Sequence, residues 1–189
     1  PGLREGFFES YKSEIAAYKL DRMLELDMVP PTVERRVNGT MVSVQLWCED
    51  VRTLKQILAL KVSSPDTVGW NRQVNRQKVF DDLIADIDDN QGNLLIDQAW
   101  NLIKIDHSRA FGNNLSIPFE VGNVSRGVNR IDRELFDRIK ALDKATVKRE
   151  IGNLLEGGAL DAMFSRRDTI VKAFEKLAAQ KGANQVFTP

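Results

Sequence analysis

Three polar side chains near the middle of the chain have the types and spacing needed to hold a metal ion beside a reactive hydroxyl. Asp88 and Asn93 are separated by four residues in the segment D-D-N-Q-G-N, and Asp106 follows Asn93 by thirteen residues. Carboxylate and amide oxygens are the hard ligands that Mg²⁺ and Mn²⁺ prefer. The pattern therefore predicts a divalent metal ion held by Asn93 and Asp106, with Asp88 free to act on a hydroxyl.

Two short apolar runs predict how these side chains come together. The runs L-L-I at 94–96 and L-I-K-I at 102–105 flank a polar stretch that contains Asp97 and Gln98. Two such runs are typical of a β-hairpin. Because a hairpin returns the chain to the edge from which it started, we expect Asn93 and Asp106 to lie side by side.

The spacing itself is typical of one kind of chemistry. D-x-x-x-x-N is the pattern of a phosphotransferase catalytic loop, and the later aspartate occupies the place of the D in D-F-G, which binds metal in kinases. In that interpretation Asp88 acts as the base or orients the substrate hydroxyl. The alternative is that Asp and Asn occur here only because both are common at turns.

Composition and charge exclude several other classes of protein. The length of 189 residues suits one domain, or one domain with an appendage, and 42% apolar and 29% charged residues suit a soluble globular protein. The 27 basic and 27 acidic residues cancel, which argues against nucleic acid as a main partner. The single cysteine, Cys48, excludes an intramolecular disulfide and a cysteine-rich zinc site. No apolar run approaches the roughly 18 residues that a membrane span needs.

The elements that must position the loop begin with a helix predicted over residues 10–26. The V-P-P segment at 29–31 ends it, because a residue before proline is pushed out of the α region. Asn38-Gly39 is a strong signal for a hairpin between arms at 32–36 and 40–47. In the second arm apolar and polar residues alternate, so one face is expected to be buried.

Further along, the pattern predicts a helix that delivers the chain into the Asp88 loop. This helix is expected over 75–87, after a short helix at 51–61 and a loop at 63–71. Gly, Asn and Ser make 112–130 a predicted loop. The remainder is predicted to be helical, over 131–142, 144–155 and 158–180. This order predicts an α+β protein with a small sheet and its helical mass at the C-terminal end.

Two blocks of sequence resemble the secreted-pathway protein kinases related to four-jointed and the Golgi casein kinase. The first, S-E-I-A-A-Y-K-L-D-R-M-L at 13–24 with V-P-P at 29–31, is similar to that family's E-I-A-A-aromatic-x-L-D-R-x-L helix. The second, I-D-H-S-R-A-F-G at 105–112, is similar to its aspartate segment ending in G-R-G-F-G. The loop spacing is shared more widely, with phosphatidylinositol 3- and 4-kinases and bacterial relatives. The resemblance covers about residues 10–112.

The resemblance implies a protein-kinase-like fold. Residues 1–50 would form a partial N-lobe of helix, hairpin and hinge. Residues 51–189 would form a mainly helical C-lobe that carries the catalytic-type loop and the metal-site hairpin. ATP with Mg²⁺ or Mn²⁺ would be the cofactors, and the acceptor would be a hydroxyl-bearing protein, lipid or small molecule.

The same resemblance implies a role for individual residues. Asp88 becomes the catalytic residue, and Asn93 and Asp106 become the metal ligands. Glu14 would hold the ATP-binding lysine, as the αC glutamate does in protein kinases. The hinge facing adenine would consist of Leu46, Trp47, Cys48 and Glu49.

Departures from the family pattern leave two functions open. Asp89 and Asn90 replace the arginine and histidine of the lipid-kinase-like loop. Asp86 stands where protein kinases have histidine. A second metal ion or a basic residue such as Arg109 would be needed to balance its negative charge. Only nine residues precede Ser10, too few for the strands that carry the lysine. We therefore expect an inactive fragment of an ATP-dependent phosphotransferase; the alternative is a pseudokinase, or a binding or regulatory module without turnover.

Other residues suggest compartment and packing. The single cysteine and the lack of a signal peptide favour a cytoplasmic bacterial protein, whereas sequons at Asn38, Asn114 and Asn123 leave an exported protein as the alternative. His107 is predicted to serve packing, and Cys48 to be a small buried strand residue. The pair at 166–167 is predicted to lie on a solvated face or in a salt bridge.

Overall fold

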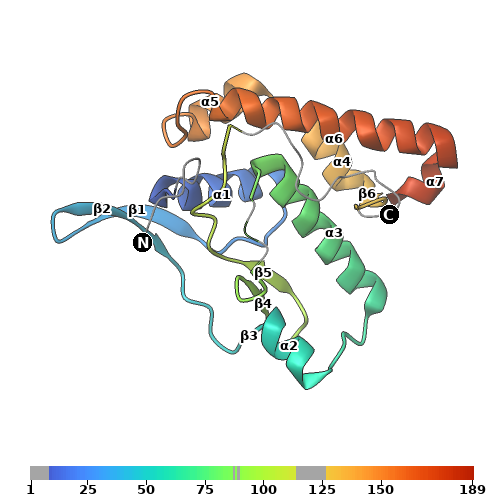
Figure 1. Ribbon diagram of the computed structural model, residues 1–189, viewed down its shortest axis with the longest axis horizontal. Coiled ribbons are helices and arrows are strands. Elements are labelled where there is room, and N and C mark those ends of the chain that lie inside the picture. The colour runs from blue at the N-terminus through green and yellow to red at the C-terminus, as the bar shows by residue number, and fades with distance from the viewer. Residues whose placement is uncertain (1–8, 87, 89, 114–126) are drawn as a thin grey trace.

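Helices and three small sheets make up the chain in a computed structural model, which describes residues 9–86, 88, 90–113 and 127–189 (Figure 1). The helices are α1 (Tyr11–Leu24), α2 (Leu54–Leu60), α3 (Thr67–Ile84), α4 (Arg133–Ala141), α5 (Lys144–Ile151), α6 (Ala159–Lys181) and α7 (Ala183–Val186). The strands are β1 (Thr32–Val37), β2 (Thr40–Gln45), β3 (Arg52–Thr53), β4 (Leu94–Ile96), β5 (Leu102–Lys104), β6 (Ile131–Asp132) and β7 (Phe187–Thr188). They form an antiparallel β1–β2 pair, a β3–β4–β5 sheet and a parallel β6–β7 pair. The predicted α+β class is confirmed.

The first helix begins and ends close to the predicted positions. Ser10 caps α1 by accepting a hydrogen bond from the Lys12 backbone N–H at 3.2 Å, and Glu25 leaves the helix in the left-handed region. Its apolar stripe, which includes the fully buried Ala16 and Leu20, packs into the core. The helix thereby contacts both α4 and α5.

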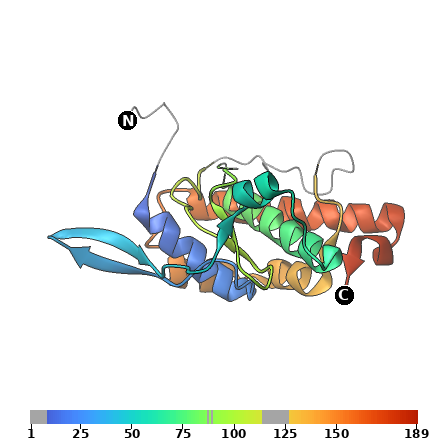
Figure 2. The ribbon, with the colours of Figure 1, turned by 90° about the horizontal axis from the view of Figure 1, so that it is seen from below.

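The predicted turn at Asn38 and Gly39 is present, with positive φ values of 50° and 83°. Those values suit a two-residue hairpin turn, and the register pairs Val33 with Val44. The prediction that one face of this hairpin is buried was wrong, since Val44 is 44% and Leu46 63% exposed. The hairpin is a sheet of only two strands that projects from the helical body, as Figures 1 and 2 both show.

The helix that leads into the Asp88 loop is longer at its start than predicted. α3 begins at Thr67 rather than at 75, inside the segment predicted to be a loop, and it ends at Ile84. Asp66 caps it by accepting a hydrogen bond from the Gly69 N–H at 2.9 Å. The segment predicted as one short helix over 51–61 is instead the strand β3 followed by α2, whose Thr53 forms a capping box with Gln56.

The core lies where the C-terminal half of α3 packs against α6 (Figure 1). Fully or almost fully buried apolar side chains from the two helices fill it: Phe80, Leu83 and Ile84 from α3, and Met163, Ile170 and Phe174 from α6. Arg76 of α3 also donates two hydrogen bonds, at 2.8 and 2.9 Å, to Asp132, the N-cap of α4.

Within the described residues, no helix combines the length and apolarity that a membrane crossing requires.

Arg166 on α6 contradicts the prediction of a solvated face. Its side chain is fully buried, and it donates from Nε to the Leu83 carbonyl at 3.0 Å and from Nη1 to the Gly112 carbonyl at 3.1 Å. Burial lowers the pKa of Arg166 to about 10. The guanidinium thus joins α6 to the C-terminal end of α3 and to the chain after Phe111. Both segments adjoin the candidate loop.

Replacing this arginine should test the connection. We expect Arg166→Leu to lower the free energy of unfolding by about 2–4 kcal/mol, because the buried Leu83 carbonyl and the partly buried contact to the Gly112 carbonyl lose a charged donor. The control is Arg149→Leu, a side chain that is 68% exposed, for which we expect a change below about 0.5 kcal/mol. Urea unfolding measures both. Equal losses in the two variants would show that the buried contacts contribute nothing.

Asp21, near the end of α1, holds the turn that follows the helix. Its Oδ1 accepts hydrogen bonds from the backbone N–H groups of Met28, at 3.0 Å, and Val29, at 3.2 Å. The side chain is fully buried. Burial raises the pKa of Asp21 to about 6, even though the two backbone hydrogen bonds favour the ionised form.

This shift predicts a pH-dependent contribution to stability. A carboxyl group whose folded pKa is raised stabilises the fold below its unfolded pKa, near 3.8, and loses that contribution as the pH rises towards 6. The Asp21→Asn variant has no group that titrates at this position and serves as the reference. Relative to that variant, the free energy of unfolding of the wild type should fall by on the order of 3 kcal/mol between pH 4 and 7. Chemical unfolding across this range measures the difference. A difference that is constant with pH would contradict the assignment.

Candidate functional site

The predicted hairpin is present and brings the ends of the candidate site together. β4 and β5 pair antiparallel, with Leu94 opposite Lys104 and Ile96 opposite Leu102. Beyond the last pair, the Ile105 N–H donates to the Asn93 carbonyl at 3.0 Å. Asn93 and Asp106 therefore flank the open end of the same hairpin.

Asp88 lies in the loop that joins α3 to this hairpin. Its backbone N–H donates to Asp86 Oδ1 at 3.1 Å, and its own Oδ2 lies 3.6 Å from Nη1 of Arg109. Arg109 follows Asp106 by three residues and also donates to Glu9 at 2.9 Å. Its hydrogen bond to Glu9, together with attraction to Asp88 and Asp106, raises the pKa of Arg109. One guanidinium thus interacts with both candidate aspartates.

Asn93 and Asp106 are suitable ligands for a hard cation. The Asn93 side chain is only 9% exposed, and its amide nitrogen has no hydrogen-bond partner among the described residues. Asp106 is exposed, and its Oδ1 accepts a hydrogen bond from Ser108 Oγ at 2.8 Å. Amide and carboxylate oxygens fit Mg²⁺ or Mn²⁺. In the described part of the chain no three His, Cys, Asp or Glu side chains cluster as a metal site, so these two residues would leave coordination positions for phosphates and water.

The prediction that a second metal ion or Arg109 balances the charge of Asp86 was wrong, because Asp86 is paired with a lysine. Asp86 is buried, and its Oδ2 lies 3.0 Å from Lys104 Nζ, which also lies 2.7 Å from Asp81 Oδ2. Burial lowers the pKa of Lys104, but attraction to Asp81 and Asp86 outweighs it and raises this pKa overall. Lys104, and not Arg109 or a second metal ion, therefore balances the charge of Asp86.

Sequence reasoning missed this ion triad, although two signals were present. Lys104 interrupts the apolar run 102–105, and Asp81 directly follows Phe80 on the predicted apolar face of α3. A charged residue at a position predicted to be buried requires a partner, because an unpaired buried charge is costly. The signal indicates burial of a charge but not its partner.

Glu14 of α1 points towards the segment that follows Asp106. Its Oε2 accepts a hydrogen bond from the His107 backbone N–H at 2.9 Å and lies 3.5 Å from His107 Nδ1. His107 is fully buried and packs edge-on against Phe80, so its predicted packing role is confirmed. Among the described residues no lysine pairs with Glu14.

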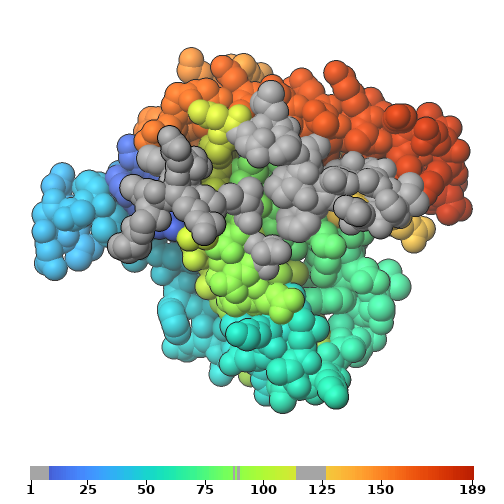
Figure 3. Space-filling model, in the orientation of Figure 1, coloured from blue at the N-terminus to red at the C-terminus, as the bar shows by residue number. Residues whose placement is uncertain are grey.

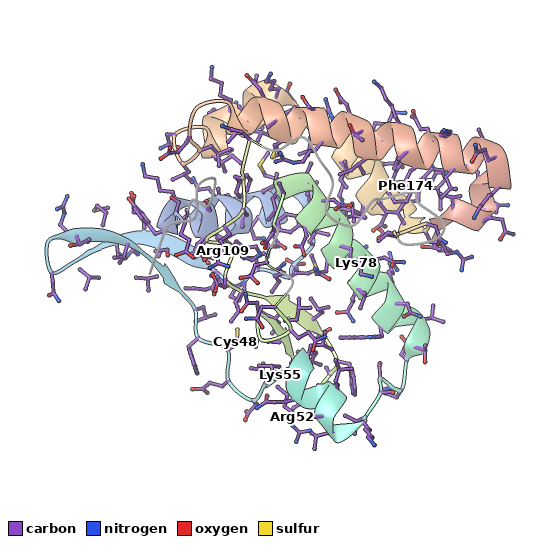
Figure 4. The ribbon with its side chains drawn as sticks, viewed as in Figure 1. Cys48, Arg52, Lys55, Lys78, Arg109 and Phe174 are labelled. Carbon is purple, nitrogen blue, oxygen red and sulfur yellow. The ribbon has the colours of Figure 1, made fainter. Side chains whose placement is uncertain are left out.

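The predicted hinge at residues 46–49 connects β2 to β3. It is anchored where the Leu46 N–H donates to the Pro31 carbonyl at 2.9 Å, while Trp47 is 83% exposed. Cys48 was predicted to be a buried strand residue, and this was wrong. β2 ends at Gln45, and Cys48 lies beyond it, only partly buried (Figure 4).

These elements together define a kinase-like fold, in which a helix and a hairpin precede a helical body with the loop between them. Solved structures of the Fam20 class share this fold. The structure of hydra Fam20 with sugar has a TM-score of 0.69 and 16% sequence identity, covering 100% of this chain and 77% of that chain. The Golgi casein kinase with Mn/ADP bound has a TM-score of 0.66 and 15% identity, covering 99% of this chain and 66% of that chain.

A second structure of the Golgi casein kinase agrees, with a TM-score of 0.65, 15% identity and 65% of its length covered. This chain therefore spans about two-thirds of the Golgi casein kinase chains. No protein-family model matches the sequence, and no curated protein is significantly similar to it. The likeness confirms the predicted fold. The wider resemblance to phosphatidylinositol kinases stays a prediction.

The ion triad offers a test of how the loop is held. We expect Lys104→Met to lower the free energy of unfolding by about 3–5 kcal/mol, because it leaves two carboxylates buried without a cation. The control Lys172→Met removes an exposed lysine from α6 and should change stability by less than about 0.5 kcal/mol.

Neutralising the carboxylates should restore part of this loss. In the triple variant Lys104→Met, Asp81→Asn, Asp86→Asn no charge remains in the triad, so stability should recover relative to Lys104→Met alone. Urea unfolding at neutral pH measures all four proteins. A triple variant less stable than Lys104→Met would show that the buried charges are not the cause.

Proposed function

We propose that this chain is part of an ATP-dependent phosphotransferase in which a divalent metal ion assists transfer of a phosphate to a hydroxyl. The observation that carries the proposal is the placement of Asn93 and Asp106 at the open end of one hairpin, next to the Asp88 loop, in a kinase-like fold. The Golgi casein kinase, a structural neighbour, has been solved with Mn/ADP bound. That neighbour supports the same cofactor class for this chain.

The proposal gives each residue a distinct task. Asp88 orients the acceptor hydroxyl and receives its proton. Asn93 and Asp106 hold Mg²⁺ or Mn²⁺, which when bound neutralises charge on the phosphates. Glu14, through its hydrogen bond to the His107 N–H, orients the backbone next to Asp106.

The rest of the nucleotide site is proposed to include chain beyond these 189 residues. The apolar face of the β1–β2 hairpin, with Val33, Val44 and Leu46 exposed by 40–63%, is suited to pack against further strands. Coverage of only 65–77% of the structural neighbours supports this proposal. A lysine from those strands would pair with Glu14. The segment 46–49 would then contact adenine.

A pseudokinase or a binding module without turnover is the second candidate. Arg109 Nη1 lies 3.6 Å from Asp88, the residue that must accept a proton. The carboxylate that would receive the proton is therefore already close to a cation. The replacement of the loop arginine and histidine by Asp89 and Asn90 also favours a pseudokinase.

Metal-dependent nucleotide binding tests the first candidate. With ATP and Mn²⁺ in about 100-fold excess over Kd, binding stabilises a protein by about 2.7 kcal/mol, which should raise its Tm by roughly 5–10 °C. We expect Asp106→Ala to abolish this shift. The control Asp137→Ala removes an exposed carboxylate of α4 and should keep it.

The measurement is made by thermal unfolding on the chain together with any upstream sequence that its gene encodes. A Tm shift that Mn²⁺ does not affect, or that survives in Asp106→Ala, would exclude the proposed metal site. A shift without phosphate transfer to any acceptor would favour the pseudokinase.

A further inference from the structure

A pocket of about 180 Å³ opens beside Asp88, on the side of the loop where α2, α3 and the β4–β5 hairpin meet. Segments of α2, the hairpin and α3 lie against one another on this face of the molecule (Figure 3). Asp88, Asn90 and Gln91 line the pocket along the loop. The proposed catalytic carboxylate is therefore part of its wall.

The other walls are mainly apolar. Trp70 and Val74 come from successive turns of α3, Leu54 from the start of α2, and Leu94 and Leu102 from the two strands of the hairpin. An apolar cavity of about 150 Å³ is large enough to bind benzene. The pocket is thus large enough for one leucine-sized or phenylalanine-sized group.

The buried polar groups of the pocket already have partners. Gln77 Nε2 donates to Asp81, and Lys104 is paired with Asp81 and Asp86. A sugar needs several donors and acceptors around its hydroxyls, whereas most of the side chains that line this pocket are apolar. The interior of the pocket therefore favours an apolar group over a carbohydrate.

Unpaired cations lie at the same place. Lys78 lines the pocket, and it has no ion pair or hydrogen bond with any residue that the structure describes. Lys55 on α2 likewise has no side-chain partner among those residues, and its backbone N–H donates to the Gln91 carbonyl at 3.4 Å. Both lysines are labelled in Figure 4. Charge complementarity therefore favours an occupant that carries a carboxylate next to its apolar group.

We propose that this pocket binds the acceptor: a peptide whose large apolar side chain enters between Trp70 and Leu94 while a nearby carboxylate pairs with Lys78. Its serine or threonine hydroxyl would then lie at Asp88. This assignment rests on the proposed phosphotransferase function. The hydroxyl oxygen bonds to the γ-phosphorus of ATP, the bond from that phosphorus to the ADP oxygen breaks, and the hydroxyl proton passes to Asp88.

Peptide binding in the absence of nucleotide and metal tests the pocket by itself. The probes are heptapeptides that each contain one serine, two glutamates and one phenylalanine. Across the series, the phenylalanine is placed at each position from two residues before the serine to two residues after it. A matched set has alanine in place of phenylalanine. Isothermal titration measures binding, and we expect at least one phenylalanine peptide to bind ten-fold or more tightly than its alanine partner.

Variants on α3 locate the binding. Val74→Phe fills the pocket and should remove the preference for phenylalanine, whereas Val68→Phe, at a side chain that is 81% exposed on the same helix, should retain it. Lys78→Glu should weaken binding at least five-fold, and the control Lys172→Glu on α6 should not. Unfolding curves of each variant establish that it is folded.

The outcomes separate the pocket from the chemistry. Equal binding of phenylalanine and alanine peptides, an unchanged preference in Val74→Phe, or binding of a disaccharide but no peptide would overturn the pocket assignment. None of these results depends on ATP, Mn²⁺ or Asp106. Phenylalanine-selective binding that Val74→Phe removes, without any metal-dependent nucleotide shift, would keep the peptide site and reject only the phosphotransferase function.

Discussion

The path of the candidate loop depends on one buried ammonium group. Lys104 Nζ lies between Asp81, in the last turn of α3, and Asp86, at the start of the loop, at 2.7 and 3.0 Å. Charges that are removed from water must be paired with good geometry, because each costs several kcal/mol otherwise. Asp86 then accepts the Asp88 N–H at 3.1 Å. The position of the proposed catalytic residue therefore follows from an ion triad that lies beneath it.

The same lysine connects the loop to the β4–β5 hairpin, which carries the proposed metal ligands. Lys104 is the last residue of β5, and its side chain is 2% exposed. Two residues later Asp106 has a φ of 59°, in the left-handed region that Asp tolerates better than most residues. This turn leaves the carboxylate of Asp106 exposed, although side chains two apart on a regular strand share a face. The last residue of β5 thus provides the buried cation, and the turn that follows the strand provides the exposed carboxylate of Asp106.

Local signals predicted the parts of the fold that depend on few residues. Asn38 and Gly39 predicted their turn because their positive φ values are a local requirement, and the two apolar runs predicted the hairpin that joins Asn93 to Asp106. Arg166 and Lys104 could not be placed, because their partners lie between 18 and 83 residues away and periodicity does not identify them. The exposed face of the first hairpin was mispredicted for a related reason. Alternation shows that one face is apolar, and it does not show that an element covers it.

In the proposed phosphotransferase, the balance of charge around the site favours binding of nucleotide and metal together. Lys104 lies between Asp81 and Asp86 beneath the loop, and Arg109 interacts with both Asp88 and Asp106. Arg109 is also shared with Glu9, and Lys78 lies in the pocket beside Asp88. A triphosphate entering this region without a divalent ion would add like charge to carboxylates that Arg109, with its side chain 38% exposed, offsets weakly. A metal ion held by the side-chain oxygens of Asn93 and Asp106 would offset that repulsion.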